Sequence, residues 1–275
     1  MSTTKEQRPP AGEKTVETVR DRYGQIASGQ TKTCCGGDIV STVDAEKLGY
    51  DESELAVLPD GANLGLGCGA PVSALELQPG ETLLDLGSGA GIDAFVAAGQ
   101  VGPEGKVIGV DMTPAMIEKA RENATKAGVA NVDFREGRLE ALPVDDATVD
   151  AVTSNCVINL VPDKAAVFAE VVRVLKPGGR VVVSDIMLEG DLPDEIRASA
   201  MAWVGCVAGA VRRSEYFDIV ERAGLRDVSV IRNLDYLTKL TACGGEPDWM
   251  KESGIRGEDL AGVVQSVTFR AVKPR

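Results

Sequence analysis

Histidine is absent from the 275-residue sequence. Zinc sites of the Cys/His type, Ser-His-Asp triads and histidine general bases are therefore excluded. Aromatic residues make up only 4% of the chain, so the core must consist mainly of Val, Leu, Ile and Ala. The six cysteines include no C-x-x-C pair, and their wide spacing disfavours a cysteine-only zinc site. Any chemistry must rely on other groups.

Positive charge is also scarce, and the formal net charge is -13. Nucleic-acid binding needs a basic face, and anionic membranes attract basic segments, so neither partner is expected. No apolar stretch reaches the length of a membrane span, and the N-terminal residues lack the apolar core of a signal peptide. We expect a cytoplasmic monomer with reduced thiols and a neutral or soft substrate.

Strand and helix patterns alternate from Leu77 onward. Helices of about a dozen residues separate short apolar runs, which is typical of an α/β, doubly wound and mostly parallel sheet. One helix is expected to begin at Thr113-Pro114, with the threonine as its cap. The expected strands are Thr82–Leu86, Lys106–Asp111, Val132–Glu136, Val149–Asn155 and Arg180–Ile186.

Three parts are expected along the chain. Residues 1–75 form an N-terminal cap with thiol-bearing loops, 76–190 the central α/β domain, and 191–275 a smaller α+β region. The alternation in the last strand is typical of an antiparallel edge strand. The expected elements outside the centre are helices at Thr15–Gly24, Pro193–Trp203 and Ser214–Ala223, and strands at Val228–Arg232 and Val263–Val272.

The first central strand runs into a glycine-rich turn in the segment LLDLGSGAG, with Asp85 in the strand and Gly87, Ser88 and Gly89 in the turn. Such a turn lets backbone approach a ligand closely. The dinucleotide fingerprint G-x-G-x-x-G would need a glycine where Ile92 stands, so a pyrophosphate is not the expected ligand. The segment resembles the first motif of class I methyltransferases, which implies that it holds the amino-acid part of S-adenosylmethionine.

Asp111 ends the next strand, where its carboxylate can accept from both ribose hydroxyls. The alternative is that Asp111 simply caps the following helix. If Asp111 binds the ribose, Met112 would lie against the adenine. By the same resemblance, Arg138, Leu139 and Glu140 would surround the edge of the base.

The fourth strand of class I methyltransferases neighbours the first. Asn155 and Cys156, at the end of VDAVTSNC, should therefore share a crevice with Gly87 and Gly89. Cys68 and Cys206 come from two further segments, each beside a glycine. Any one of these cysteines alone is more often a packing residue, but a thiol in the cofactor crevice suggests chemistry.

Several segments resemble arsenite methyltransferases: CGGDIVS, NLGLGCGAP, TSNCVINLVPDK, WVGCVAGA and SVTFRAVK. The resemblance covers nearly the whole chain and implies a seven-stranded Rossmann-like sheet. It also implies that Cys68, Cys156 and Cys206 bind trivalent arsenic as the substrate to be methylated by S-adenosylmethionine. Arsenic(III) is soft and prefers thiolates, and its lone pair can attack a methyl group without a general base.

Methylation oxidises arsenic to the pentavalent state, and two thiols can return two electrons by forming a disulfide. The resemblance implies that Cys34 or Cys35 does so with Cys68, and that thioredoxin or a small thiol is the final reductant. Cys243 is expected to be dispensable. Two other hypotheses stay open: a methyltransferase acting on carbon or oxygen of a small metabolite, and a metalloid-binding protein without turnover.

Overall fold

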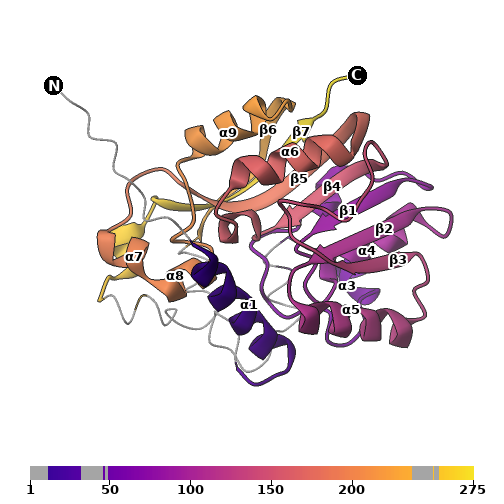
Figure 1. Ribbon diagram of the computed structural model, residues 1–275, viewed down its shortest axis with the longest axis horizontal. Helices are drawn as coiled ribbons and strands as arrows, with labels where there is room; N and C mark the ends of the chain where they lie inside the picture. The colour runs from indigo at the N-terminus through magenta and orange to yellow at the C-terminus, as the bar shows by residue number, and fades with distance from the viewer. Residues whose placement is uncertain (1–11, 32–45, 47–48, 237–249, 251–253) are drawn as a thin grey trace.

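A single seven-stranded sheet runs through the protein (Figure 1). The computed structural model describes residues 12–31, 46, 49–236, 250 and 254–275. The strand order is β3-β2-β1-β4-β5-β7-β6, and the first five strands are parallel. The strands are β1 Thr82–Leu86, β2 Lys106–Asp111, β3 Val132–Glu136, β4 Val149–Asn155, β5 Leu175–Leu188, β6 Arg226–Asp235 and β7 Val264–Val272.

The predicted α/β class and doubly wound, mostly parallel sheet are confirmed, and the first four strands have the predicted bounds. The edge position predicted for the last strand is wrong. β7 is antiparallel but pairs with β5 on one side and β6 on the other. Its alternating polar side chains, including Ser266 and Thr268, are buried and hydrogen-bonded rather than exposed to solvent. The alternation of polar and apolar residues in β7 therefore reflects buried polar contacts and not a solvent-exposed face.

Helices cover both faces of the sheet (Figure 1). Two sequence predictions about them are wrong in detail. Thr113 precedes α5, but its side chain makes no cap bond. The expected helix 193–203 is broken at Ser199, whose backbone is extended and whose hydroxyl instead caps the next helix. The helices are α1 Glu13–Ala27, α3 Glu52–Ala56, α4 Ile92–Val101, α5 Pro114–Ala127, α6 Lys164–Val174, α7 Asp194–Ala198, α8 Ala200–Val204 and α9 Arg213–Arg222.

Neighbouring strand residues enter different cores because side chains alternate across a sheet. Leu83 packs with α4 and α5 on one face, whereas Leu84 packs with α6 and α9 on the other. Both leucines are fully buried. The central strands are consequently apolar on both faces, as expected for parallel strands that helices cover on both sides.

The helix α1 lies across the carboxyl end of the sheet and contacts both α5 and α8 (Figure 1). Its Val19 is buried, and its Tyr23 hydroxyl donates to the Val204 carbonyl at 3.3 Å. This helix therefore joins the central α/β part to the segment that carries Cys206. Among the described helices, none has the length and apolarity needed to cross a membrane.

Candidate active site

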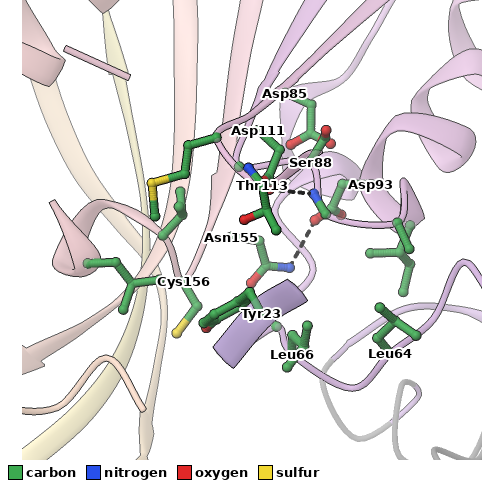
Figure 2. A pocket seen from close by; sticks show the side chains of 18 of the residues that line it. Tyr23, Leu64, Leu66, Asp85, Ser88, Asp93, Asp111, Thr113, Asn155 and Cys156 are labelled. Atoms are coloured by element: carbon green, nitrogen blue, oxygen red, sulfur yellow. Dashed lines mark hydrogen bonds between the residues drawn. The ribbon is translucent and has the colours of Figure 1, made fainter. Parts of the chain in front are cut away.

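A pocket of about 1020 Å³, including its open mouth, lies at the carboxyl ends of β1, β2 and β4 under α1. Ligands of open α/β sheets bind at this edge. In Figure 2, Asp85, Asp93 and Asp111 lie at one end of the pocket and the Cys156 thiol at the other. The pocket is lined by all the predicted cofactor-binding residues: Asp85, Gly87, Ser88, Gly89, Asp111, Met112, Arg138, Leu139, Glu140 and Asn155.

The turn after β1 depends on glycine. Gly87 has a φ of 66°, in the left-handed region, and a Cβ atom there would lie 2.5 Å from the Val157 side chain. Val157 itself lines the pocket immediately after Cys156. The glycine thus allows the end of β1 and the end of β4 to approach each other closely. The predicted proximity of these two strand ends is confirmed by the β1–β4 pairing.

Three carboxyl groups are buried beside this turn. Burial and the neighbouring Asp93 and Asp111 raise the pKa of Asp85 well above its ordinary value. Burial also raises the pKa of Asp93 to about 6, against hydrogen bonds from Asn155 and Tyr50. Within the described residues, Asp85 Oδ2 and Ser88 Oγ have no hydrogen-bond partner. A buried acidic cluster with an unsatisfied oxygen favours a ligand that brings positive charge and hydrogen-bond donors.

Asp111 is oriented by backbone donors. Its carboxylate accepts from the Gly89 amide at 3.0 Å and from the Thr113 amide at 2.8 Å. It lies two residues before Thr113, which holds the N-cap position of α5, so it fixes the β2–α5 turn rather than acting as the cap of that helix. Burial raises its pKa. The ammonium, sulfonium and ribose hydroxyls of S-adenosylmethionine match the charge and acceptors present here.

The sequence did not single out Asp93, Tyr50 or Tyr23, which also line the pocket. Asp93 stands one residue beyond Ile92, so its place after the glycine turn was a usable signal. The Tyr50 hydroxyl donates to Asp93 Oδ1 at 2.8 Å, and both side chains are buried. Tyr23 comes from α1, and its presence depends on how that helix packs across the sheet, which no local pattern specifies.

Cys68, Cys156 and Cys206 come together in one apolar cluster with Trp203, and each is buried. The Cys156 thiol makes hydrogen-bond contacts with both other thiols. The contact with Cys206 and burial raise the pKa of Cys156 well above its ordinary value, against a lowering by Cys68. Within the described ranges, no three His, Cys, Asp or Glu side chains form a group suited to a metal ion. The thiols therefore meet around Cys156 without a preassembled set of three ligands.

Two of these cysteines have unusual backbone angles. Cys156 has a φ of 61° and Cys206 a φ of 64°, in the left-handed region that disfavours residues with a side chain. The Cys206 thiol donates to the Cys156 carbonyl at 2.7 Å, and the Cys156 amide donates to the Ser184 carbonyl at 2.8 Å. Such strain persists only where surrounding contacts hold the backbone, and it is concentrated at functional sites. Cys34, Cys35 and Cys243 lie outside the described residues.

The strand order, the glycine turn and the pocket at the carboxyl edge define the fold of class I methyltransferases. The family model of the methyltransferase domain matches residues 77–224. A phosphoethanolamine N-methyltransferase of Haemonchus contortus, solved with S-adenosyl-L-methionine, has a TM-score of 0.62 at 19% identity. That match covers 86% of this chain and 61% of the other, and it supports the fold alone.

Closer relatives narrow the class. An arsenite methyltransferase of Halobacterium salinarum is 44% identical over 95% of this chain and 67% of its own length. The mouse arsenite methyltransferase is 38% identical over 75% of this chain, which spans 56% of that protein. The arsenic(III) S-adenosylmethionine methyltransferase of Chlamydomonas reinhardtii has a TM-score of 0.61 at 30% identity, covering 84% of this chain and 74% of that one. This chain belongs to the arsenite methyltransferase family.

Proposed function

We propose that this chain transfers a methyl group from S-adenosylmethionine to trivalent arsenic held by the thiolates of Cys68, Cys156 and Cys206. The observation that carries the proposal is the position of Cys156. Its side chain lines the cofactor pocket and also contacts both other thiols. A soft atom bound there would face the pocket from which the methyl group comes.

S-adenosylmethionine supplies an electrophilic methyl group on a positively charged sulfur. In this proposal the glycine turn and Asp85 hold its amino-acid part, and Asp111 accepts from its ribose hydroxyls. Met112, Arg138, Leu139 and Glu140 surround the adenine. The acidic end of the pocket favours the cation, and the apolar cluster around the thiols keeps water from the acceptor.

The thiols bind arsenite by exchange. Each thiol forms one arsenic–sulfur bond, and its proton leaves with an arsenite hydroxyl as water, so three thiols release three waters. This exchange suits Cys156, because the raised pKa keeps its thiol protonated before the substrate arrives. Three sulfur ligands leave one lone pair on arsenic, and that lone pair is the nucleophile. No protein base is required, which is compatible with a chain that has no histidine.

The methylated product is pentavalent and needs two electrons to become trivalent again. We propose that Cys34 or Cys35 forms a disulfide with Cys68, which releases two electrons and two protons. A thioredoxin or small thiol would then reduce the disulfide. A monomer in the cytoplasm, where such reductants are present, is the expected setting. In this division of labour, residues 1–75 and 191–275 supply thiols to the cofactor-binding part at 76–190.

The test is direct. Arsenite, S-adenosylmethionine and glutathione are incubated with the protein, and the products are separated by chromatography with arsenic detection. Methylated arsenicals are expected. Bound arsenite with no methylated product would indicate a metalloid-binding protein instead. Neither bound arsenite nor product would remove the arsenic proposal and favour a methyltransferase for a small metabolite.

A further inference from the structure

The side chain of Asn155 has its hydrogen bonds directed at protein rather than at the open pocket. Its Oδ1 accepts from the amides of Cys68 at 3.0 Å and Gly69 at 3.3 Å. Its Nδ2 lies 2.8 Å from the Gly69 carbonyl, 3.0 Å from Asp93 Oδ2 and 3.1 Å from the Tyr50 hydroxyl. Figure 2 shows the contact with Asp93. We call this set of bonds from Asn155 to Cys68 and Gly69 the clamp. It differs from the direct contact with the cofactor that the sequence predicted for Asn155.

We infer that Asn155 is a positioning residue, which holds the Cys68 thiol against Cys156 and links that arrangement to the cofactor pocket. Asn155 and Cys156 are consecutive in the chain. The same segment therefore fixes the backbone of Cys68 through residue 155 and contacts its thiol through residue 156. The functional meaning rests on the proposed arsenic methylation, but the placement of the two thiols can be tested without arsenic.

The glycines beside Cys68 show how tightly the loop is held. A Cβ atom at Gly67 would lie 2.8 Å from Asn155 Nδ2 and 3.1 Å from its Oδ1. A Cβ atom at Gly69 would lie 2.5 Å from Ser184 Oγ. The Asn155 amide cannot move aside without breaking its bonds to the loop and to Asp93. Glycine is thus required on both sides of Cys68, because Asn155 and Ser184 leave no space for a side chain at residues 67 and 69.

The carbonyl of Cys68 is held by a second side chain, which comes from β7. Ser266 on β7 donates through its hydroxyl to the Cys68 carbonyl at 2.7 Å. The amide and the carbonyl of Cys68 are therefore both bonded to side chains, one from β4 and one from β7. When Asn155 is replaced, the bond from Ser266 to the Cys68 carbonyl remains. The substitution should therefore loosen the loop rather than release it completely.

The link to the cofactor pocket runs through Asp93. This carboxylate accepts from Asn155 and from Tyr50, and it lines the pocket beside Asp85. A cation bound in the pocket favours the ionised carboxylate, which is the stronger acceptor for the Asn155 amide. Cofactor binding should therefore tighten the grip on Cys68. By thermodynamic reciprocity, arsenite on the thiols should tighten cofactor binding to the same extent.

The first experiment measures the thiol pair itself. In protein whose other four cysteines are serine, diamide oxidises Cys68 and Cys156 to a disulfide and is reduced to the hydrazine, and the rate reports their proximity. We expect N155A to slow disulfide formation about 10-fold, since it leaves the Cys68 amide without its acceptor. The matched control is N159A. It removes a buried asparagine, whose amide donates to Asp185 and the Ile186 carbonyl instead of the Cys68 loop.

N159A should form the disulfide at a rate within about 2-fold of the parent, even if both variants lower the melting temperature equally. Equal rates in N155A and its parent would overturn the inference. Equal slowing in N155A and N159A would also overturn it, because the effect would then be general loosening of the fold.

A double-mutant cycle covers the case in which N155A is simply unstable. Gly67→Ala pushes a methyl group against the Asn155 amide, so alone it should slow disulfide formation about 10-fold. In the N155A background the space is open, and the same glycine change should alter the rate by less than about 2-fold. Additive effects of the two substitutions would contradict a clamp between residue 155 and the loop.

Arsenite affinity then tests the functional meaning. Trp203 packs in the thiol cluster, and Trp249→Phe leaves it as the sole tryptophan reporter. We expect N155A to weaken arsenite binding about 10-fold and to abolish its enhancement by S-adenosylmethionine. If the parent protein binds no arsenite, the proposed function fails while the disulfide result still decides the role of Asn155. If N155A weakens cofactor binding and leaves arsenite affinity unchanged, Asn155 is a cofactor ligand and the inference fails.

Discussion

The two ends of the active site differ in chemistry and in how the chain assembles them. The cofactor end has three buried carboxyl groups, with one oxygen of Asp85 left without a partner among the described residues. The thiol end has three buried sulfurs in an apolar cluster that includes Trp203. The first is suited to a cation with hydroxyl groups and the second to a soft, uncharged acceptor.

This contrast explains how one pocket can serve two unlike ligands. Burial favours the protonated form at both ends, because it raises the pKa of Asp85 and contributes to the raised pKa of Cys156. At the cofactor end, a bound positive charge favours loss of the proton. At the thiol end, formation of an arsenic–sulfur bond removes it. Burial therefore opposes charge at both ends, and at each end the matching ligand offsets that effect: a cation beside the carboxyl groups and a soft acceptor at the thiols.

The largest expected effect comes from a substitution at the thiol end, which should lower methylation and leave cofactor binding nearly unchanged. Cys156→Ser should lower the rate of arsenite methylation by at least about 100-fold, since a hydroxyl is a poor ligand for a soft centre. Cofactor affinity should stay within about 3-fold, because the acidic end is unchanged. Product chromatography and calorimetry would measure the two quantities. Activity equal to that of the parent would favour the alternative of a small-metabolite methyltransferase.

The reciprocal variant acts on the other end. Asp85→Asn keeps the shape of the side chain but removes the charge, and we expect cofactor affinity to fall about 10- to 100-fold. Arsenite binding, followed through Trp203 fluorescence in Trp249→Phe protein, should change less than about 3-fold. Glu122→Gln on the exposed side of α5 is a control for the change in net charge. Equal losses at both ends would show that the two sites cannot be treated separately.

Acidity should affect the cofactor end through its raised pKa values. The pKa of Asp93 is about 6, so this group is protonated below that pH and ionised above it. A cationic ligand favours the ionised form, so its affinity should rise as pH increases from 5 to 7 and be about 10-fold weaker at pH 5. Titration calorimetry in two buffers of different ionisation heat should detect proton release on binding near pH 6. Proton uptake, or an affinity that rises toward low pH, would contradict this assignment.

The same shift has a consequence for stability that needs no ligand. Because folding raises the pKa of Asp93, the folded state holds its proton more tightly than the unfolded state does. The contribution of this group to the free energy of unfolding should therefore fall as pH rises from about 4 to about 6. Asp93→Asn should flatten that part of the curve of melting temperature against pH.

The two ends also differed in how far the sequence revealed them. Asp85, Gly87 and Asp111 lie at or just beyond the carboxyl ends of strands whose bounds are readable from apolar runs, so the cofactor end could be predicted from local pattern and fold rules. The thiol residues were predicted through the family resemblance. No local pattern specifies that Asn155 holds the Cys68 loop, because its partners lie 86 and 87 residues away. Likewise β7 was placed at the sheet edge because its buried polar residues alternate as exposed ones do.

The smallest expected effect tests which cysteines belong to the thiol end. If Cys68, Cys156 and Cys206 form the complete arsenic-binding set, a fourth cysteine far along the chain should contribute little. Cys243→Ser should therefore leave methylation rate and arsenite affinity within about 2-fold of the parent, as for most substitutions away from a site. The comparison is best made over several turnovers with limiting thiol, because a redox role would slow later turnovers more than the first. A selective loss in those later turnovers would assign Cys243 to the reductive half of the reaction and place the disulfide partner of Cys68 in the tail.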